Sequence, residues 1–257
     1  MDQVFVISDI HGRFKMLEKL LTKWQRDEQQ LIFLGDYMNR GEDSLRVLQT
    51  VKHLVDEHHA IALKGNHEAM FLEWMQMPER RTQMFINIGG IATIQSLKTF
   101  VLERDSTIEQ LVASIKDEHS HITDWLETLP LYYKWGNYFF VHAGINPYVE
   151  QPEHSPEEDL LWIRDEFTQF PHTAAETIVF GHTPTTNLND DMSGNVWLSP
   201  CSKKIGIDGG APYVEGQLNG IVLTKGDMHM TVYAVKGDEL TVEQRHVTQH
   251  AKPSSNI

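Results

Sequence analysis

Short runs of apolar residues recur along the chain and divide it into segments with different hydrophobic periods. Each run has three or four consecutive apolar residues, as expected for a strand that is buried on both faces. Between the first runs, apolar positions recur at helical spacing over 14–24 and over 45–55. This alternation of strands and helices predicts an α/β fold with helices packed on a sheet. The predicted strands are 4–7, 31–34, 60–63, 138–141 and 178–180.

The middle of the chain, from about 71 to 129, has a helical pattern and is rich in Met and Trp. We interpret it as a helical insertion between strands, and we expect Phe71, Trp74, Met75 and Met77 to be core residues. Further strands are predicted from 204 onward. No repeat or long linker divides the sequence, so we predict one domain over 1–250, followed by a disordered tail at 251–257.

Composition narrows the choice of function. The chain has 257 residues, 40% of them hydrophobic, and a formal net charge of −14. This charge disfavours nucleic acid as a partner, although bound cations could still create a local phosphate site. The single cysteine, Cys201, suits a reducing compartment, and neither an export signal nor a membrane-spanning run is apparent. We therefore expect a cytoplasmic protein with no membrane partner.

Polar side chains with metal-binding chemistry follow each predicted strand and stand beside a glycine. Parallel strands bring their carboxyl ends to one edge of a sheet, where sites form, and glycine lets the backbone turn sharply there. Any one of these motifs could be a turn with a satisfied histidine, but the occurrence of all five favours a common site. The motifs are SDIHG (Asp9, His11), GDYMNRG (Asp36, Asn39, Arg40), KGNHE (Asn66, His67), HAG (His142) and GHT (His182).

The spacing of these residues is compatible with two metal ions. Asp9 and His11 are two apart, so on an extended segment both point to the same side. Asp36 could bridge two ions through its carboxylate, and the second ion could take Asn66, His142 and His182. This donor set suits manganese, which we expect, or iron or zinc. Two such ions about 3.5–4 Å apart would support attack of a bridging hydroxide on phosphorus.

Taken together, the motifs resemble those of the calcineurin-like metallophosphoesterases, and more closely the phosphoprotein phosphatase branch, whose pattern runs GDxHG, GDxxDRG, GNHE, HAG, GHT. The resemblance extends from Val4 to about Leu223. It includes DLLWIRDEF, where bacterial and phage members place a second phosphate-binding arginine, matched here by Arg164. It also includes IGIDGGAPYVEGQLNGIVL and the helical stretch with Gly89 and Gly90. Symmetrical diadenosine tetraphosphate hydrolases are relatives of this branch.

The resemblance implies a sandwich of two mixed β-sheets flanked by helices, with a dinuclear metal site at the strand ends. It implies that Asp9, His11 and Asp36 hold one ion, and that Asp36, Asn66, His142 and His182 hold the other. Arg40 and Arg164 would clamp the phosphate, to which Asn66 and His67 also contribute. His67 would protonate the leaving group.

Position 39 departs from the family pattern, which has aspartate before the arginine to orient the catalytic histidine and favour its charged form. An amide supplies no negative charge, so imidazolium would be less populated above a pH of about 6.5. Three interpretations remain open here. Glu42, Asp43 or Glu68 could supply the charge, the substrate could have a better leaving group, or catalysis could have decayed to leave a metal-binding scaffold.

The sequence thus favours a phosphomonoesterase, foremost a serine/threonine protein phosphatase. The alternatives are a symmetrical dinucleoside polyphosphate hydrolase and a catalytically weakened scaffold. The expected partner is a phosphorylated protein or a small phosphoester. The oligomeric state, native metal and physiological substrate stay open.

Overall fold

The computed structural model describes residues 1–97 and 107–247, and the predicted tail at 251–257 lies outside these ranges. The strands form a six-stranded sheet, in the order β11-β10-β9-β1-β2-β3, and a five-stranded sheet, in the order β4-β5-β6-β8-β7. The first sheet contains β1 (Gln3–Ile7), β2 (Gln29–Phe33), β3 (Ile61–Ala62), β9 (Leu218–Thr224), β10 (His229–Lys236) and β11 (Glu239–His246). The second contains β4 (Tyr132–Trp135), β5 (Tyr138–Val141), β6 (Thr177–Phe180), β7 (Trp197–Leu198) and β8 (Lys204–Gly206).

Both sheets are mixed. In the first, β1 pairs in parallel with β2, and β2 with β3, while β9 pairs antiparallel with β1. In the second, β5, β6 and β8 are parallel neighbours. The carboxyl ends of β1 and β2, and those of β5 and β6, therefore each lie at one edge of a sheet, which is where loops carrying functional groups can converge.

Alternation along the strands explains the layers. Val4 and Val6 of β1 pack in a cluster with Phe140 and Val179 of the second sheet, so these faces of the two sheets meet. Phe5, next in sequence, points the other way and packs with residues of α1 and α2. Strands buried on both sides need apolar residues at every position, and the continuous runs in the sequence reflect that need. The predicted α/β class and the two-sheet sandwich are confirmed.

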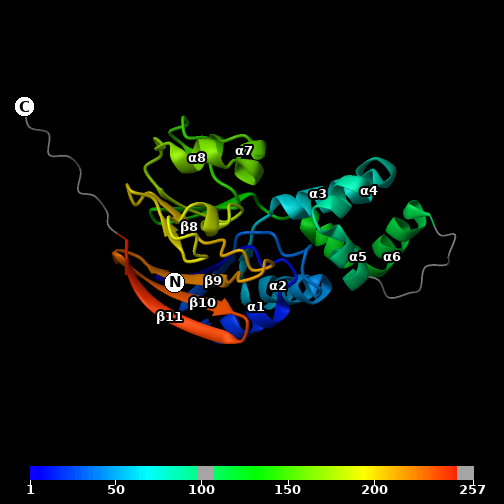
Figure 1. Cartoon of the computed structure of the whole chain (residues 1–257), viewed down its shortest axis with the longest axis horizontal. Helices are drawn as coiled ribbons and strands as arrows, with labels where there is room; N and C mark the ends of the chain where they lie inside the picture. The colour runs from blue at the N-terminus through cyan, green and yellow to red at the C-terminus, as the bar shows by residue number, and fades with distance from the viewer. Residues whose placement is uncertain (98–106, 248–257) are drawn as a thin grey trace, which may run out of the picture.

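The helices flank these sheets (Figure 1). Helices α7 and α8 lie above β8 in that view, α1 and α2 lie beside the first sheet, and α3 to α6 project to the right. Their bounds are α1 (Phe14–Leu21), α2 (Ser44–His58), α3 (Asn66–Gln76), α4 (Pro78–Asn87), α5 (Gly90–Leu97), α6 (Ile108–Glu127), α7 (Glu157–Trp162) and α8 (Asp165–Gln169), with 3-10 turns at Pro152–His154 and Thr185–Asn187.

Helix α3 begins at Asn66, immediately after the glycine of the GNHE motif, so Asn66 and His67 stand in its first turn. Its Phe71, Trp74 and Met75 are buried, as expected of core residues. Met77 follows the helix and is 38% exposed, so the expectation that it is a core residue is wrong. Met77 links α3 to α4, where the chain turns at Pro78 and no longer presents that side chain to the core.

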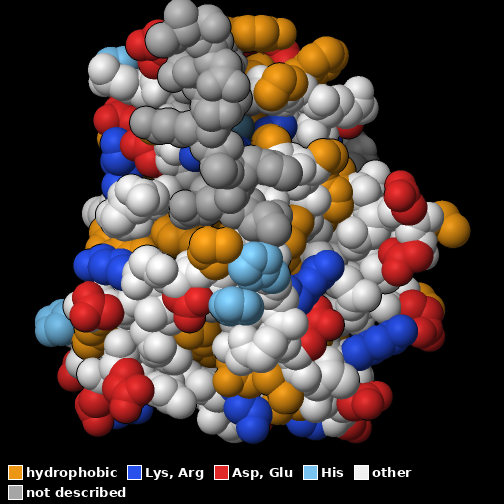
Figure 2. Space-filling view, turned by 90° about the vertical axis from the view of Figure 1, so that its left-hand side faces the viewer, with side chains coloured by type: hydrophobic (Ala, Val, Ile, Leu, Met, Phe, Trp, Pro, Cys, Tyr) orange, Lys and Arg blue, Asp and Glu red, His pale blue; other side chains and the backbone are white. Residues whose placement is uncertain are grey.

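The surface carries mixed charge. Figure 2 shows one face of the molecule, on which acidic side chains are interspersed with basic ones. Among residues 1–97 and 107–247, no helix is long and apolar enough to cross a membrane.

Candidate metal centre

The predicted ligands come from strand ends that converge between the two sheets. Asp9 and His11 follow β1, Asp36 follows β2, His142 follows β5 and His182 follows β6, while Asn66 opens α3. All six side chains are buried. The backbone is unusual there: of the ten non-glycine residues with positive φ in the described chain, six are Asp9, His11, Asp36, Asn39, Arg40 and His182. Such conformations cost energy and cluster at functional sites, where the surrounding fold enforces them.

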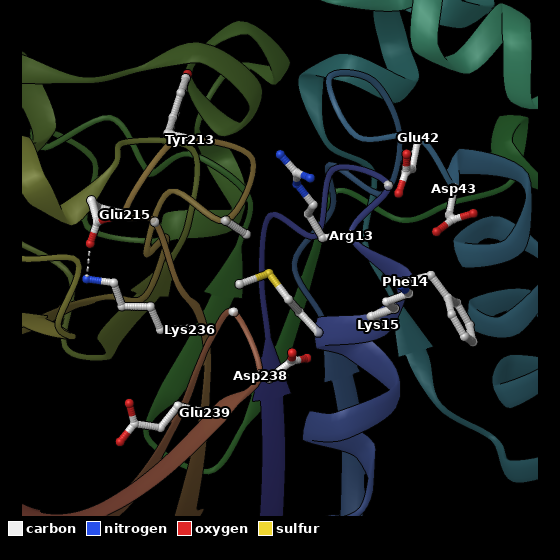
Figure 3. Close-up of a pocket in the computed structure, with 15 residues that line it drawn as sticks. Arg13, Phe14, Lys15, Glu42, Asp43, Tyr213, Glu215, Lys236, Asp238 and Glu239 are labelled. Atoms are coloured by element: carbon white, nitrogen blue, oxygen red, sulfur yellow. Dashed lines mark ion pairs between the residues drawn. The ribbon is translucent and has the colours of Figure 1, made fainter.

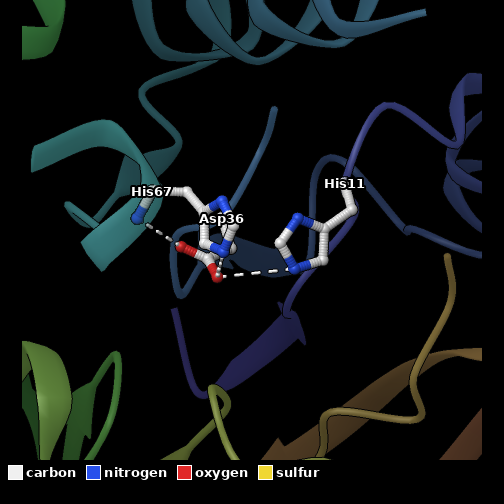
Figure 4. A group of neighbouring side chains, drawn as sticks. All are labelled: His11, Asp36 and His67. Atoms are coloured by element: carbon white, nitrogen blue, oxygen red, sulfur yellow. Dashed lines mark hydrogen bonds and ion pairs between the residues drawn. The ribbon is translucent and has the colours of Figure 1, made fainter. Parts of the chain in front are cut away.

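Asp36 lies between two groups of potential ligands. Its Oδ2 is 3.4 Å from Nε2 of His11 and 3.8 Å from Nε2 of His67 (Figure 4). These three residues form one group whose ligand atoms lie close enough to hold a metal ion. Asp36 Oδ1 is 3.4 Å from Nε2 of His142. Asp36, His142 and His182 form the second such group.

Asn66 completes the second group. Its Oδ1 is 2.9 Å from Nε2 of His142 and 3.1 Å from Nδ1 of His182. The amide oxygen and the two imidazoles therefore face a common point, which Asp36 approaches from the side of His142. Carboxylate, imidazole and amide oxygen together form a donor set suited to manganese, iron or zinc.

The outer hydrogen bonds of the histidines fix which nitrogen faces the centre. Nδ1 of His11 donates to the carbonyl of Met38 at 2.8 Å, and Nδ1 of His142 donates to the carbonyl of Leu34 at 2.9 Å. The Nε2 lone pairs of both rings must then face Asp36, itself an acceptor. Two acceptors that face each other in a buried space repel unless a cation lies between them. Metal-ligating histidines commonly donate their other ring N–H to a backbone carbonyl, as His11 and His142 do here. The residues therefore fit divalent metal ions.

Asp9 lies beside these groups and is not part of either. Its carboxylate accepts from the backbone N–H of His182, at 3.0 Å to Oδ1, and from the hydroxyl of Ser8. Burial, followed by the charges of Asp208 and Asp36, raises the pKa of Asp9 well above its usual value. Burial likewise raises the pKa of Asp36 to about 7. Carboxylates in this arrangement are difficult to ionise together unless a cation is present.

Asp208 is a further buried carboxylate that our sequence prediction missed. Burial raises its pKa to about 6, and its Oδ1 accepts from the N–H of Gly210 at 2.8 Å. It follows β8 directly after the apolar Ile207, as the other acidic residues follow their strands. The same signal, a carboxylate beside glycine after a strand, could have identified it.

The two predicted phosphate-binding arginines both reach the centre. Nη1 of Arg40 is 2.7 Å from Nε2 of His11, and its Nη2 is 3.2 Å from Nε2 of His67. Nη1 of Arg164 donates to the carbonyl of His182 at 2.8 Å. A metal ion on His11 would compete with the Arg40 contact. Guanidinium groups at both sides of the centre suit bidentate recognition of phosphate oxygens.

His67 is held by Asn39, and Asn39 is held by Thr93 of α5. The Thr93 hydroxyl donates to Oδ1 of Asn39 at 2.6 Å and accepts from the backbone N–H of Asn39 at 2.8 Å. This turns Nδ2 of Asn39 towards Nδ1 of His67, 2.8 Å away. Nδ1 therefore accepts, and a neutral ring would carry its proton on Nε2. Arg40 can only donate, so its Nη2 must turn away from Nε2 when that proton is present. No motif or periodicity in the sequence pointed to Thr93, which stands 54 residues from Asn39.

The environment of His67 favours a neutral ring. Burial, then the neighbouring His11 and Arg40, lowers the pKa of His67 well below its ordinary value. Glu68, one of the residues considered as a source of compensating charge, points elsewhere. Its carboxylate accepts from the backbone N–H groups of Asp36, Tyr37 and Gly65 at 2.8, 2.9 and 3.0 Å. These bonds hold the loop of Asp36 in place and cap α3, and none of them is made with the ring of His67.

A two-sheet sandwich with histidine–carboxylate groups at the strand ends is the architecture of a metal-dependent hydrolase. The chain belongs to the calcineurin-like phosphoesterase family, whose model matches residues 3–214. The expected family resemblance is confirmed, and with it the assignment as a hydrolase of the metallophosphoesterase family.

Relatives with different names match the chain over different lengths. A symmetrical bis(5'-nucleosyl)-tetraphosphatase of Nitrosospira multiformis is 32% identical over 147 residues, which are 56% of this chain and 44% of that protein. Serine/threonine-protein phosphatase 1 of Salmonella typhimurium is 44% identical over 72 residues, 27% of this chain and 32% of that protein. The chain thus spans less than half the length of these relatives.

Solved structures bear on the fold. The crystal structure of a putative diadenosine tetraphosphatase superposes with a TM-score of 0.62 and 21% identity, and covers 92% of this chain and 94% of its own. At this identity the likeness concerns the fold alone.

Proposed function

We propose that this chain is a metal-dependent phosphohydrolase that cleaves the phosphoanhydride bonds of dinucleoside polyphosphates. The observation that supports this choice is the contact of 2.8 Å between Nδ2 of Asn39 and Nδ1 of His67. An amide that donates to Nδ1 favours neutral imidazole and opposes imidazolium. The acid available to the leaving group is therefore weak.

A weak acid limits the reaction to good leaving groups. A serine or threonine alkoxide needs a proton as it departs, because its conjugate acid is very weak. A nucleotide phosphate is stable as an anion and can leave with little help. In the proposed reaction a water oxygen bonds to one phosphorus and the bond from that phosphorus to the bridging oxygen breaks. The bridging oxygen leaves on the departing nucleotide as an oxyanion, and the proton released by the water goes to solvent.

The side chains of the centre have separate roles in this proposal. Asp9, His11 and Asp36 would hold one divalent ion, and Asp36, Asn66, His142 and His182 the other, with manganese as the expected metal. When bound, these ions would supply Lewis-acid activation of the phosphate and lower the pKa of water. Arg40 and Arg164 would bind the phosphate oxygens, and the Nε2–H of His67 would donate a hydrogen bond to the bridging oxygen.

A second candidate is hydrolysis of phosphoserine and phosphothreonine, which the sequence alone favoured. The match to serine/threonine-protein phosphatase 1, at 44% identity over 72 residues, supports it. In that case the reaction would proceed with His67 as a poor acid and would be slow with alkyl leaving groups.

The experiment compares both substrates on one preparation. We expect purified protein with manganese to hydrolyse diadenosine tetraphosphate with a higher kcat/KM than a phosphoserine peptide, and to lose both activities with a chelator. A preference for the phosphopeptide would favour the second candidate. Absence of hydrolysis with manganese, iron and zinc would favour the scaffold interpretation.

A further inference from the structure

A cavity of about 620 Å³ opens between the loop after β1 and the loops around Tyr213 and Asp238 (Figure 3). Its lining includes Gly12 and Glu42. Gly12 follows the ligand His11, and Glu42 stands two residues after Arg40. The backbones of these two loops are joined, because the N–H of Gly41 donates to the carbonyl of His11 at 3.0 Å. The cavity therefore adjoins the side of the centre that holds His11, Arg40 and His67.

The charges around the cavity disfavour a polyanion. Three basic and five acidic side chains line it, and one pair, Lys236 and Glu215, is joined at 2.8 Å. Phosphate groups would thus remain at the metal centre and its arginines. Apolar atoms of Phe14, Met16 and Ala211 also line the cavity. Such a lining suits a neutral group with an apolar face and several hydrogen-bond donors, because carboxylates accept from hydroxyl and amino groups.

Tyr213 supplies an aromatic surface at the rim of this cavity. It is 52% exposed, and the guanidinium carbon of Arg40 lies 5.5 Å from the centre of its ring. Its loop is held in place, since Nη2 of Arg13 donates to the carbonyl of Pro212 at 2.8 Å. In the view of Figure 3, Tyr213 and Glu42 lie on either side of Arg13. An exposed ring beside a phosphate-binding arginine is placed to stack a base whose phosphate that arginine holds.

We propose that this cavity binds the nucleoside of the leaving nucleotide, with its base against Tyr213 and its ribose near the acidic side chains. This inference rests on the proposed function and adds a subsite to it. The leaving group is the appropriate half of the substrate because His67, which would face the bridging oxygen, contacts Arg40 and His11, and the near neighbours of these two residues, Glu42 and Gly12, line the cavity. Nε2 of His67 is 3.2 Å from Nη2 of Arg40, and its ring centre is 4.7 Å from that of His11.

The test changes the ring and leaves the metal ligands intact. In the metal-loaded protein, Tyr213→Leu should raise KM for diadenosine tetraphosphate about tenfold, while kcat/KM for p-nitrophenyl phosphate stays within twofold. Tyr213→Trp should keep KM near the wild-type value. Val214→Ala is the matched control, because Val214 is the next residue of the loop, is 92% exposed and does not line the cavity. An equal effect of Tyr213→Leu on both substrates would mean that Tyr213 acts through Arg40, and no effect on either would also overturn the proposal.

A binding measurement separates this inference from the proposed function. Adenosine, which carries no phosphate, should bind wild-type protein by calorimetry and bind Tyr213→Leu at least fivefold more weakly. If diadenosine tetraphosphate proves a poor substrate, the proposed function fails, but loss of adenosine binding in the variant would still support the subsite. If adenosine does not bind, and Tyr213→Leu raises KM only for a phosphopeptide with flanking arginines, the cavity is a peptide site and the inference is wrong.

Discussion

Nδ2 of Asn39 lies 2.8 Å from Nδ1 of His67, so an amide occupies the place where a carboxylate would charge the ring. The carbonyl of the same amide accepts from the hydroxyl of Thr93 at 2.6 Å, which sets the direction of the amide. Burial also opposes the charge on His67. The relationship between these two residues accounts for the choice of substrate proposed for this centre, and it can be tested by substitution.

Asn39→Asp should convert His67 into a stronger acid. The carboxylate would accept from Nδ1–H and raise the pKa of His67, so imidazolium would persist to higher pH. We expect kcat for a phosphoserine peptide to rise about tenfold, within the range usual for general acid catalysis. Hydrolysis of p-nitrophenyl phosphate, whose leaving group departs unaided, should change less than twofold. Steady-state rates on both substrates between pH 5.5 and 8.5 check this, and equal acceleration of both would contradict it.

Thr93→Val should release the amide of Asn39. The change keeps the shape of the side chain but removes the donor to Oδ1 of Asn39 and the nearer of two acceptors for its backbone N–H, the other being Oγ of Ser44 at 3.2 Å. Leaving buried polar groups unpaired costs roughly 1–3 kcal/mol of stability. Once freed, the amide can present its oxygen to His67, so the ratio of phosphopeptide to diadenosine tetraphosphate activity should rise.

Thr82→Val serves as the control for that variant. Thr82 accepts from Nε1 of Trp74 at 2.9 Å and lies in α4, within the helical region and outside the metal centre. It should lower the midpoint of urea unfolding and leave the ratio of the two activities unchanged. A similar change of ratio in both variants would show that general loosening, and not the direction of the Asn39 amide, alters substrate choice.

Asp36→Asn should change stability with a sign that depends on metal. In chelated wild-type protein, burial raises the pKa of Asp36 to about 7, so the folded state retains a proton that the unfolded state releases near pH 4. The contribution of Asp36 to stability is therefore full below pH 4 and falls as pH rises to 7, by about 1.4 kcal/mol for each unit of pKa difference. The side chain of the Asp36→Asn variant does not titrate, so the variant does not lose this stability as the pH rises.

The difference between the two proteins isolates this effect. Neighbouring histidines titrate in the opposite sense, because burial lowers the pKa values of His11 and His142, and the stability they contribute is lost as pH falls below about 6.5. With a chelator, the free energy of unfolding of Asp36→Asn, measured with urea, should rise relative to that of the wild type as the pH increases from 5 to 8. With manganese, only the wild type should be stabilised, and the variant should lose at least a hundredfold in activity. A constant difference across pH would contradict this account.

The polar loops are easier to predict from the sequence than the pairing of the strands or the distant residues that contact those loops. Each strand-end motif is local, since an apolar run followed by a ligand and glycine is visible within ten residues, as for Asp9 and His11. The pairing of strands is not local: β9 lies between β1 and β10, and the two-sheet arrangement was expected only from the family resemblance. Thr93 acts on Asn39 from 54 residues away on a helix with no distinguishing pattern, so only the folded chain reveals its role.

Gly89→Ala should disturb Arg40 without touching a metal ligand. Gly89 has a φ of +91°, and a Cβ added there would lie 2.8 Å from Cγ and 2.9 Å from the backbone nitrogen of Arg40. The carbonyl of Gly89 also accepts from that nitrogen, at 3.1 Å. The alanine must therefore move the arginine, and we expect kcat/KM to fall at least tenfold for every phosphate substrate.

Gly226→Ala is the matched control, because Gly226 has a φ of +75° and no atom within 4 Å of an added Cβ. Both variants should lose about 1 kcal/mol from backbone strain, but only Gly89→Ala should lose activity; a similar loss in Gly226→Ala would show that strain alone, and not the position of Arg40, determines the rate.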